Sequence, residues 1–131
     1  MFLRRGRRFW AAAVGLAVVV VAIGLGSSQR WQSERLRIVA ENTAKATDLK
    51  TAIDSRFPAG TAESLVVTFL QKEHAGYVRW PAGNRTEYGL PVGDEPSEVS
   101  NCGSWTRGVR LRFESGRLVR SAVERWSDDC L

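Results

Sequence analysis

The strongest pattern in the chain is an apolar run that continues from Phe9 to Gly26 without one charged or strongly polar side chain. As a helix, a run of this length rises about 1.5 Å per residue and spans about 27 Å, close to the thickness of a bilayer's hydrocarbon core. The pattern therefore predicts a transmembrane helix or signal anchor over residues 9–26. The alternative is a secretory signal cleaved near Gly26, since Gly24-Leu25-Gly26 forms a small-x-small site.

Four arginines precede this run, and they predict its orientation. Basic residues gather on the cytoplasmic side of membrane helices. Residues 1–8 are therefore expected to form a cytoplasmic basic tail, with the rest of the chain periplasmic or extracellular. The sequence predicts a single-pass protein of the inner (cytoplasmic) membrane. The orienting residues are Arg4, Arg5, Arg7 and Arg8.

Two further helices are predicted after the apolar run. Apolar residues at helical spacing extend from Trp31 to Phe57, so residues 27–57 read as a stalk-like helix that Pro58 ends. Thr61 is a candidate N-cap for a second helix that reaches His74. A strand is the alternative for this second segment, because its centre, Val66-Val67-Thr68-Phe69, is β-prone.

The residues from Tyr77 to Ser100 predict little regular structure. Tyr77 to Trp80 form a short strand candidate that Pro81 stops. Glycines, prolines and acidic residues fill positions 81–100, which predicts a long acidic loop, with an edge strand near positions 86–90 as an open alternative. Such a loop is either functional or a solvated connection.

The last third predicts a β-hairpin. Apolar and polar residues alternate from Trp105 to Phe113, and a second apolar run leads from Leu118 to Trp126 after a glycine-containing turn. If Glu114 faces Arg117, the two cysteines fall within one residue of being opposite, an offset that a bulge absorbs. The sequence therefore predicts a disulfide bond across the open end of the hairpin. The cysteines are Cys102 and Cys130.

Together these elements predict an α+β fold. An N-terminal transmembrane helix is followed by two helices packed on a small antiparallel sheet with a C-terminal β-hairpin. Residues 58–131 are expected to form a small extracytoplasmic domain. The helices are expected to pack on one face of the sheet and to bury Leu49, Ile53, Leu65, Phe69, Val109, Leu111 and Val123.

Charge and composition narrow the classes of function. Four of the nineteen basic residues precede the apolar run, which leaves fifteen basic residues against all fourteen acidic residues after it. A domain so close to neutrality is a poor general binder of nucleic acid. His74 is the single histidine, and no nucleophile motif, phosphate loop or metal-ligand spacing accompanies it. The sequence predicts no catalytic residue, cofactor, metal or small-molecule substrate.

Charged and aromatic residues of the last two thirds form a candidate partner surface. The hairpin is rich in arginine, and its polar face suits an acidic partner or anionic lipid headgroups. The alternative is that these arginines pair with the acidic residues between Glu87 and Glu98 and keep the outer face soluble. The candidate residues are Arg110, Arg112, Arg120, Arg125, Trp80, Glu87, Asp94, Glu95 and Glu98.

The order of elements also resembles a known family. Gly60-Thr61 opens a helix, and an extended segment and a hairpin containing Val-Arg-Leu-Arg-Phe-Glu-Ser-Gly-Arg-Leu follow. From Phe57 to Trp126 this order is similar to small envelope domains of the BamE/SmpA–OmlA type, which are two-helix, three-strand modules. The family's lipidated cysteine and its Leu-Gly-x-Pro turn are missing here, so no functional residue is carried over.

The sequence as a whole favours a non-catalytic, membrane-anchored binding or scaffold protein of a bacterial cell envelope. Its expected contacts are membrane lipid through residues 9–26 and another envelope protein. The alternative is a secreted or anchored inhibitor or immunity-type protein that acts through an acidic loop at residues 87–98.

Overall fold

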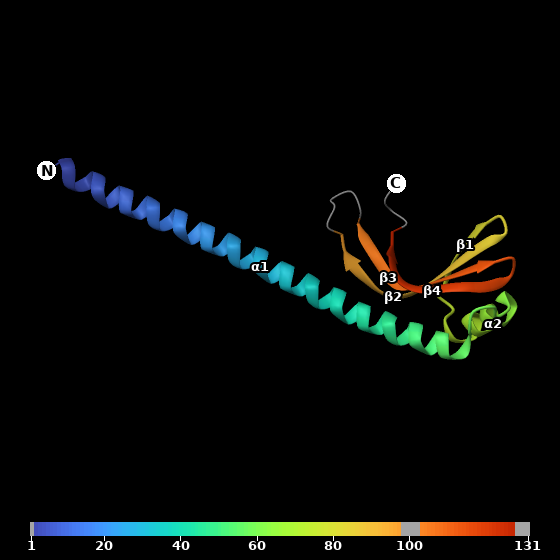
Figure 1. The fold of residues 1–131 in the computed structure, drawn as a ribbon. Coiled ribbons are helices and arrows are strands. Elements are labelled where there is room, and N and C mark those ends of the chain that lie inside the picture. Colours follow the sequence, from blue (N-terminus) through green and yellow to red (C-terminus); the bar gives the residue numbers. More distant parts are fainter. Residues whose placement is uncertain (1, 98–102, 128–131) are drawn as a thin grey trace. The chain divides into compact units, whose positions relative to one another are not determined.

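The computed structural model describes residues 2–97 and 103–127, and it divides the chain into two compact units (Figure 1). The first unit is Met1–Arg37 and the second is Ile38–Leu131. Helix α1 (Phe2–Arg56) contains the whole of the first unit's described backbone and supplies its last residues to the second. The prediction that residues 9–26 are helical is confirmed.

The prediction of a transmembrane helix over residues 9–26 rests on side chains most of which the structure does not describe. Side chains are described for residues 20–24, 26–97 and 103–127. Within these residues, no helix combines the length and the apolar character needed to cross a bilayer. Most of the run from Phe9 to Gly26 lies outside them, as do the side chains of the orienting arginines. The transmembrane helix stays a prediction.

The second half of α1 is part of a folded domain. Ala46 and Ile53 are fully buried in the same core as the sheet, which explains why the compact unit begins at Ile38 and not after Pro58. The helix ends at Arg56, directly before Phe57 and Pro58, as the proline predicts. Residues 38–56 therefore pack against the sheet and are not a free stalk.

Helix α2 (Glu63–Glu73) confirms the second predicted helix, with two corrections. The N-cap is Ala62, and it makes no side-chain capping bond. The hydroxyl of Thr61 instead donates to the carbonyl oxygen of Pro58 at 2.6 Å, which closes the turn between the helices. Leu65 is 63% exposed, so its assignment to the core was wrong; Val66 and Leu70 are the buried side chains of α2.

Four strands form one antiparallel sheet in the order β1-β2-β3-β4. They are β1 (Val78–Ala82), β2 (Arg85–Pro96), β3 (Ser104–Glu114) and β4 (Arg117–Trp126). The long acidic loop was therefore a wrong prediction over residues 85–96, which are a central strand. Pro81 lies inside β1 and does not stop it, because an edge strand tolerates a residue without an N–H.

The C-terminal hairpin is confirmed with the predicted register. Glu114 faces Arg117 across a two-residue turn in which Ser115 and Gly116 both have positive φ. A register shift at Arg112/Phe113 then changes the sum of paired residue numbers from 231 to 232, and this register continues to Thr106 and Trp126. Cys102 and Cys130 also sum to 232, but both lie outside the described residues, and their disulfide stays a prediction.

The core of the second unit lies between the two helices and one face of the sheet (Figure 1). Ile53, Val109 and Leu111 are buried as predicted, while Leu49, Phe69 and Val123 are partly buried and pack against that core. A hydrogen bond of 2.6 Å from the Tyr88 hydroxyl to the Glu63 carboxylate ties β2 to the first turn of α2. Burial and this bond both raise the pKa of Tyr88.

The corrected face of α2 leads to a stability prediction. Replacing Leu70 with alanine removes a fully buried side chain and leaves a cavity, so we expect the free energy of unfolding to fall by about 2–5 kcal/mol. The matched control is Leu65→Ala, one and a half turns away on the exposed face, with a change of less than about 0.5 kcal/mol. Urea unfolding measures both, and equal losses would contradict the assigned face.

Candidate interaction surface

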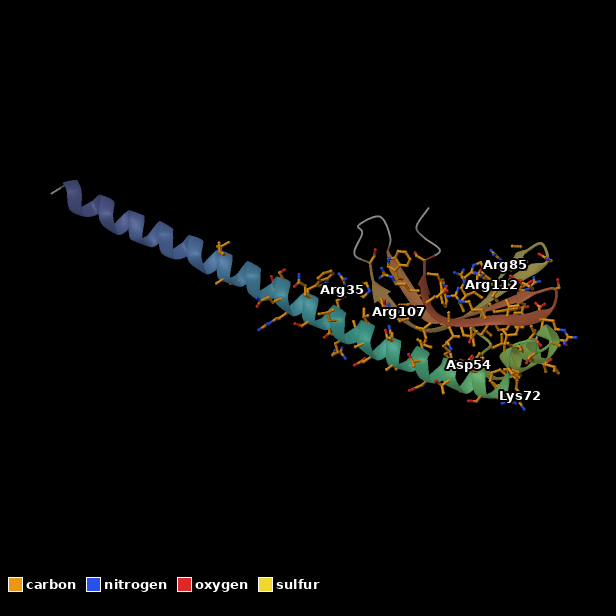
Figure 2. The ribbon with its side chains drawn as sticks, viewed as in Figure 1. Arg35, Asp54, Lys72, Arg85, Arg107 and Arg112 are labelled. Carbon is orange, nitrogen blue, oxygen red and sulfur yellow. The ribbon has the colours of Figure 1, made fainter. Side chains whose placement is uncertain are left out.

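The sheet has a covered face and an open face. Along β3, Val109, Leu111 and Phe113 are buried against the helices, and the residues between them point the other way. The Ile38–Arg56 part of α1 and α2 both lie on the covered face (Figure 1). Figure 2 shows Arg85 and Arg112 on the side of the sheet that faces away from them. The open face is therefore the candidate interaction surface.

Two tryptophans from opposite edge strands meet over the middle of the open face. Trp80 of β1 and Trp126 of β4 pack edge to face, with ring centroids 5.5 Å apart. The two strands between them present glycine at this level. A Cβ atom on Gly89 would lie 2.6 Å from the Trp80 ring, and one on Gly108 would lie 2.8 Å from the Trp126 ring. The absence of these side chains leaves room for the two rings to meet above the sheet.

Arg110 connects the tryptophan pair to a row of charges. Its guanidinium carbon lies 4.5 Å from the centroid of the Trp80 ring, which is a cation–π contact. On one side its Nε is 3.6 Å from a Glu87 carboxylate oxygen, and on the other its Nη1 donates to Glu124 at 3.3 Å. The Nε atom is buried and makes no hydrogen bond. Arg110 is therefore held by charge and stacking on three sides.

The charge row continues to both sides of Arg110. Arg112 donates from Nε to Glu87 at 3.0 Å, and Arg120 places an Nη2 atom 3.8 Å from Glu124. Positive and negative groups thus alternate across β2, β3 and β4, which neutralises most of the charge within the surface. Arg120 is the most exposed member, with 58% of its side chain accessible.

Glu87 is the carboxylate on which two arginines converge. Burial alone would raise its pKa, but the hydrogen bond from Arg112 and the nearby charges of Arg110, Arg112 and Arg85 outweigh burial and lower it. The carboxylate therefore stays ionised at neutral pH. A permanently charged, mostly enclosed Glu87 is suited to positioning guanidinium groups and unsuited to exchanging protons near pH 7.

The structure brings together only part of the predicted partner surface. Trp80, Glu87, Arg110, Arg112 and Arg120 lie on the open face. Asp94 also faces that side, where the Thr106 hydroxyl donates to it at 3.2 Å. Glu95 and Arg125 belong to the covered face at the other end of the sheet, and Glu98 lies outside the described residues.

Glu95 is the most buried charged group described in the second unit. It is 1% exposed, and Arg107 binds its two carboxylate oxygens from the neighbouring strand. Beside it, the side-chain amide of Asn42 of α1 donates to the carbonyl oxygen of Asp94 at 3.2 Å. Asn42 also packs against Gly93, where an added Cβ atom would lie only 2.3 Å from the Asn42 Oδ1 atom. The pair is therefore a built-in part of the helix–sheet contact. Arg125 stacks on Trp105 nearby, at 4.8 Å.

The interpretation that the hairpin arginines pair with acidic residues between Glu87 and Glu98 is confirmed for two acids. Glu87 pairs with Arg110 and Arg112, and Glu95 pairs with Arg107. Sequence reasoning missed Glu124 and Trp126 as members of the surface. Once the hairpin register is known, Glu124 falls opposite Gly108 and Trp126 opposite Thr106, so the register was the signal that would have found them.

Comparison with protein-family models, with curated proteins and with solved structures found no match. Among the residues that the structure describes, no group of three or more His, Cys, Asp and Glu side chains is arranged to hold a metal ion. The arrangement on the open face offers stacked aromatic rings beside fixed charges. Aromatic residues and arginine are enriched in protein–protein interfaces, so the open face remains the candidate interaction surface.

The converging charges at Glu87 lead to a pH-dependent prediction. Replacing Glu87 with glutamine leaves the arginines without their carboxylate, so we expect the free energy of unfolding at pH 7 to fall by about 1–3 kcal/mol. Because the folded pKa is lowered from 4.5, this contribution is fully present above that pH and is lost as the pH falls through the folded value. The difference in the free energy of unfolding between Glu87→Gln and the unaltered protein should therefore narrow as the pH falls.

Urea unfolding at a series of pH values between 7 and the acid limit measures this difference. The control is Glu114→Gln, which removes an exposed carboxylate at the end of β3. We expect that variant to stay within about 0.5 kcal/mol of the unaltered protein. A gap for Glu87→Gln that is constant with pH would contradict the role of its charge.

Proposed function

We propose that the chain is a membrane-anchored, non-catalytic binding or scaffold protein of a bacterial cell envelope, with its second unit on the far side of the inner membrane. The observation that carries the proposal is a set of uncovered apolar side chains on α1. Val20, Val21 and Ile23 are 62%, 60% and 67% exposed. These residues continue the apolar run that starts at Phe9, and large exposed apolar surface calls for lipid or a protein partner.

The transition at the end of the run supports a lipid environment. After Gly26 the helix becomes polar, and from Arg30 onward charged residues are frequent. Trp31 is 52% exposed and lies under the guanidinium of Arg35, with 5.6 Å between that group and the ring centroid. An exposed tryptophan beside arginine shortly after an apolar span is typical of the interface between lipid and water.

The open face supports a binding role for the second unit. Its charges are already paired and its aromatic rings are already stacked, so a partner meets a preformed surface that needs little ordering. An inhibitor acting through an acidic loop has less support, because residues 85–96 form β2 and its Glu87 and Glu95 are engaged in ion pairs. The proposal does not rest on BamE-type domains, which have three strands where this sheet has four.

Membrane anchoring is tested with the full chain in a bacterial host. We expect the protein to stay with the membranes after an alkaline carbonate wash, and external protease to digest its second unit in spheroplasts but not in intact cells. Replacing the four N-terminal arginines with glutamine should lower the digested fraction, because the orienting charge is lost. The control carries four such replacements at exposed residues of the second unit: Lys45, Lys72, Arg79 and Arg85.

Release of the unaltered protein by carbonate would contradict the anchor. An equal digested fraction for the two quadruple variants would contradict the role of the N-terminal charge in orientation.

Binding through the open face is tested by photo-crosslinking in cells. A photoreactive amino acid at Arg85 on the open face should give an adduct with one other envelope protein, while the same amino acid at Lys72 of α2 should not. Figure 2 shows these two residues on opposite sides of the second unit, and both are exposed. Equal adducts from both positions, or none from Arg85, would remove the open face as the binding surface.

A further inference from the structure

The edges of the sheet differ in their protection against pairing with another strand. Exposed sheet edges are normally blocked by prolines, bulges or covering segments. Strand β1 contains Pro81. The part of β2 that extends beyond β1 contains Pro91 and Pro96, with a register shift at Pro91/Gly93. From Ala122 to Trp126, β4 has no proline and no register shift.

The start of the β4 edge is already used by the chain itself. Ala62 forms a β-bridge with Arg117, the N–H of Leu118 donates to Thr61 at 2.9 Å, and the N–H of Gly60 donates to Leu118 at 2.7 Å. This short antiparallel segment shows that the edge accepts an added strand. Among the described residues, the backbone hydrogen bonds of this segment reach no further along β4 than Leu118.

The direction of the next backbone groups follows from the hairpin. Residues of an antiparallel strand direct their N–H and C=O groups alternately towards and away from the neighbouring strand. Leu118 directs both outward, as its two bonds show. The register shift inserts Val119 as an extra residue, because Phe113 faces Leu118 and Arg112 faces Arg120. Outward-directed groups therefore resume at Ser121 and Val123, which pair with no further strand among the residues that the structure describes.

We propose that a second copy of this chain pairs with β4 in antiparallel fashion, about a two-fold axis at Val123, to give one continuous eight-stranded sheet. Outward-directed residues must face each other across the new pairing, so the axis passes through a residue and not between two. With the axis at Ala122, Trp126 of the second copy would run into the position that Thr61 occupies. With the axis at Glu124, two glutamates would face each other directly, which is destabilising.

The axis at Val123 also brings opposite charges together. Arg120 then lies opposite Trp126 of the second copy and diagonal to its Glu124, within reach of a long side chain. On the covered face, Ser121 lies opposite Arg125 of the second copy. The Ser121 hydroxyl is bonded to Asp54, so the arginine meets a carboxylate whose pKa is lowered by the Lys50 and Ser121 hydrogen bonds. Because the edge carries both signs of charge, it fits a copy of itself better than a strand of a single charge.

The test uses a pair of variants at the axis. The Val123 N–H points away from β3, so Val123→Pro leaves the hydrogen bonds of the sheet intact while it removes the central donor of the pairing in both copies. Val123→Ala removes the same side chain from the core but keeps that N–H. Sedimentation of the purified full chain should show a dimer for the unaltered protein and for Val123→Ala. Val123→Pro should dimerise at least about tenfold more weakly.

Far-UV circular dichroism shows whether each variant is folded. If Val123→Pro is not folded, the same comparison of dimerisation is made between Ser121→Pro and its control, Ser121→Ala. A monomer at every concentration of the unaltered protein would overturn the proposal. So would equal dimerisation of the proline and alanine variants, which would place the contact elsewhere. If the unaltered protein carries a different bound protein that Val123→Pro loses, the edge takes a foreign strand, and the proposed pairing with a second copy is wrong. None of these outcomes depends on membrane anchoring, which the carbonate wash tests separately.

Discussion

The register between β2, β3 and β4 is the constraint on which the rest of the second unit depends. On β3 it sends Val109, Leu111 and Phe113 into the core and sends Arg110 and Arg112 to the open face. Two guanidiniums on one central strand are tolerable only with carboxylates beside them, and the same register supplies Glu87 from β2 and Glu124 from β4. A slip by one residue would exchange the two faces and bury the arginines without partners.

Glycine makes this arrangement compatible with two large rings on the same face. Trp80 and Trp126 come from the two outer strands, and they meet only because Gly89 and Gly108 present no side chain between them. A Cβ on Gly108 would also come within 2.0 Å of the Leu90 carbonyl oxygen, so the close approach of β2 and β3 depends on the same residue. Strand spacing, the packing of the two rings and the position of Arg110 are therefore coupled on the open face.

Elements with local signals were predictable from the sequence, and those set by distant partners were not. The hairpin was found with its register because Ser115-Gly116 and the flanking alternation lie within one short segment. Strand β2 was predicted mainly as a loop, with a strand near positions 86–90 only as an alternative, because Pro91, Pro96 and its acids resemble a loop, while its partners lie elsewhere in the chain. The exposed Leu65 shows the same limit: its spacing fits a helix face, but only the docking of α2 decides which face is buried. Glu87 and Arg112 were named as candidates, yet only the sheet shows that they bind each other.

A contact through one strand edge is small, and its strength depends on how well the two edges match. Five or so paired residues on each copy form a short contact, so its strength rests on the backbone hydrogen bonds and on the charge pairs beside them. Two chains anchored in one bilayer meet at a much higher effective concentration than in solution, so the same hydrogen bonds and charge pairs give a larger dimer fraction there. The open face is left free in such a pair, because pairing along β4 extends the sheet in its own plane.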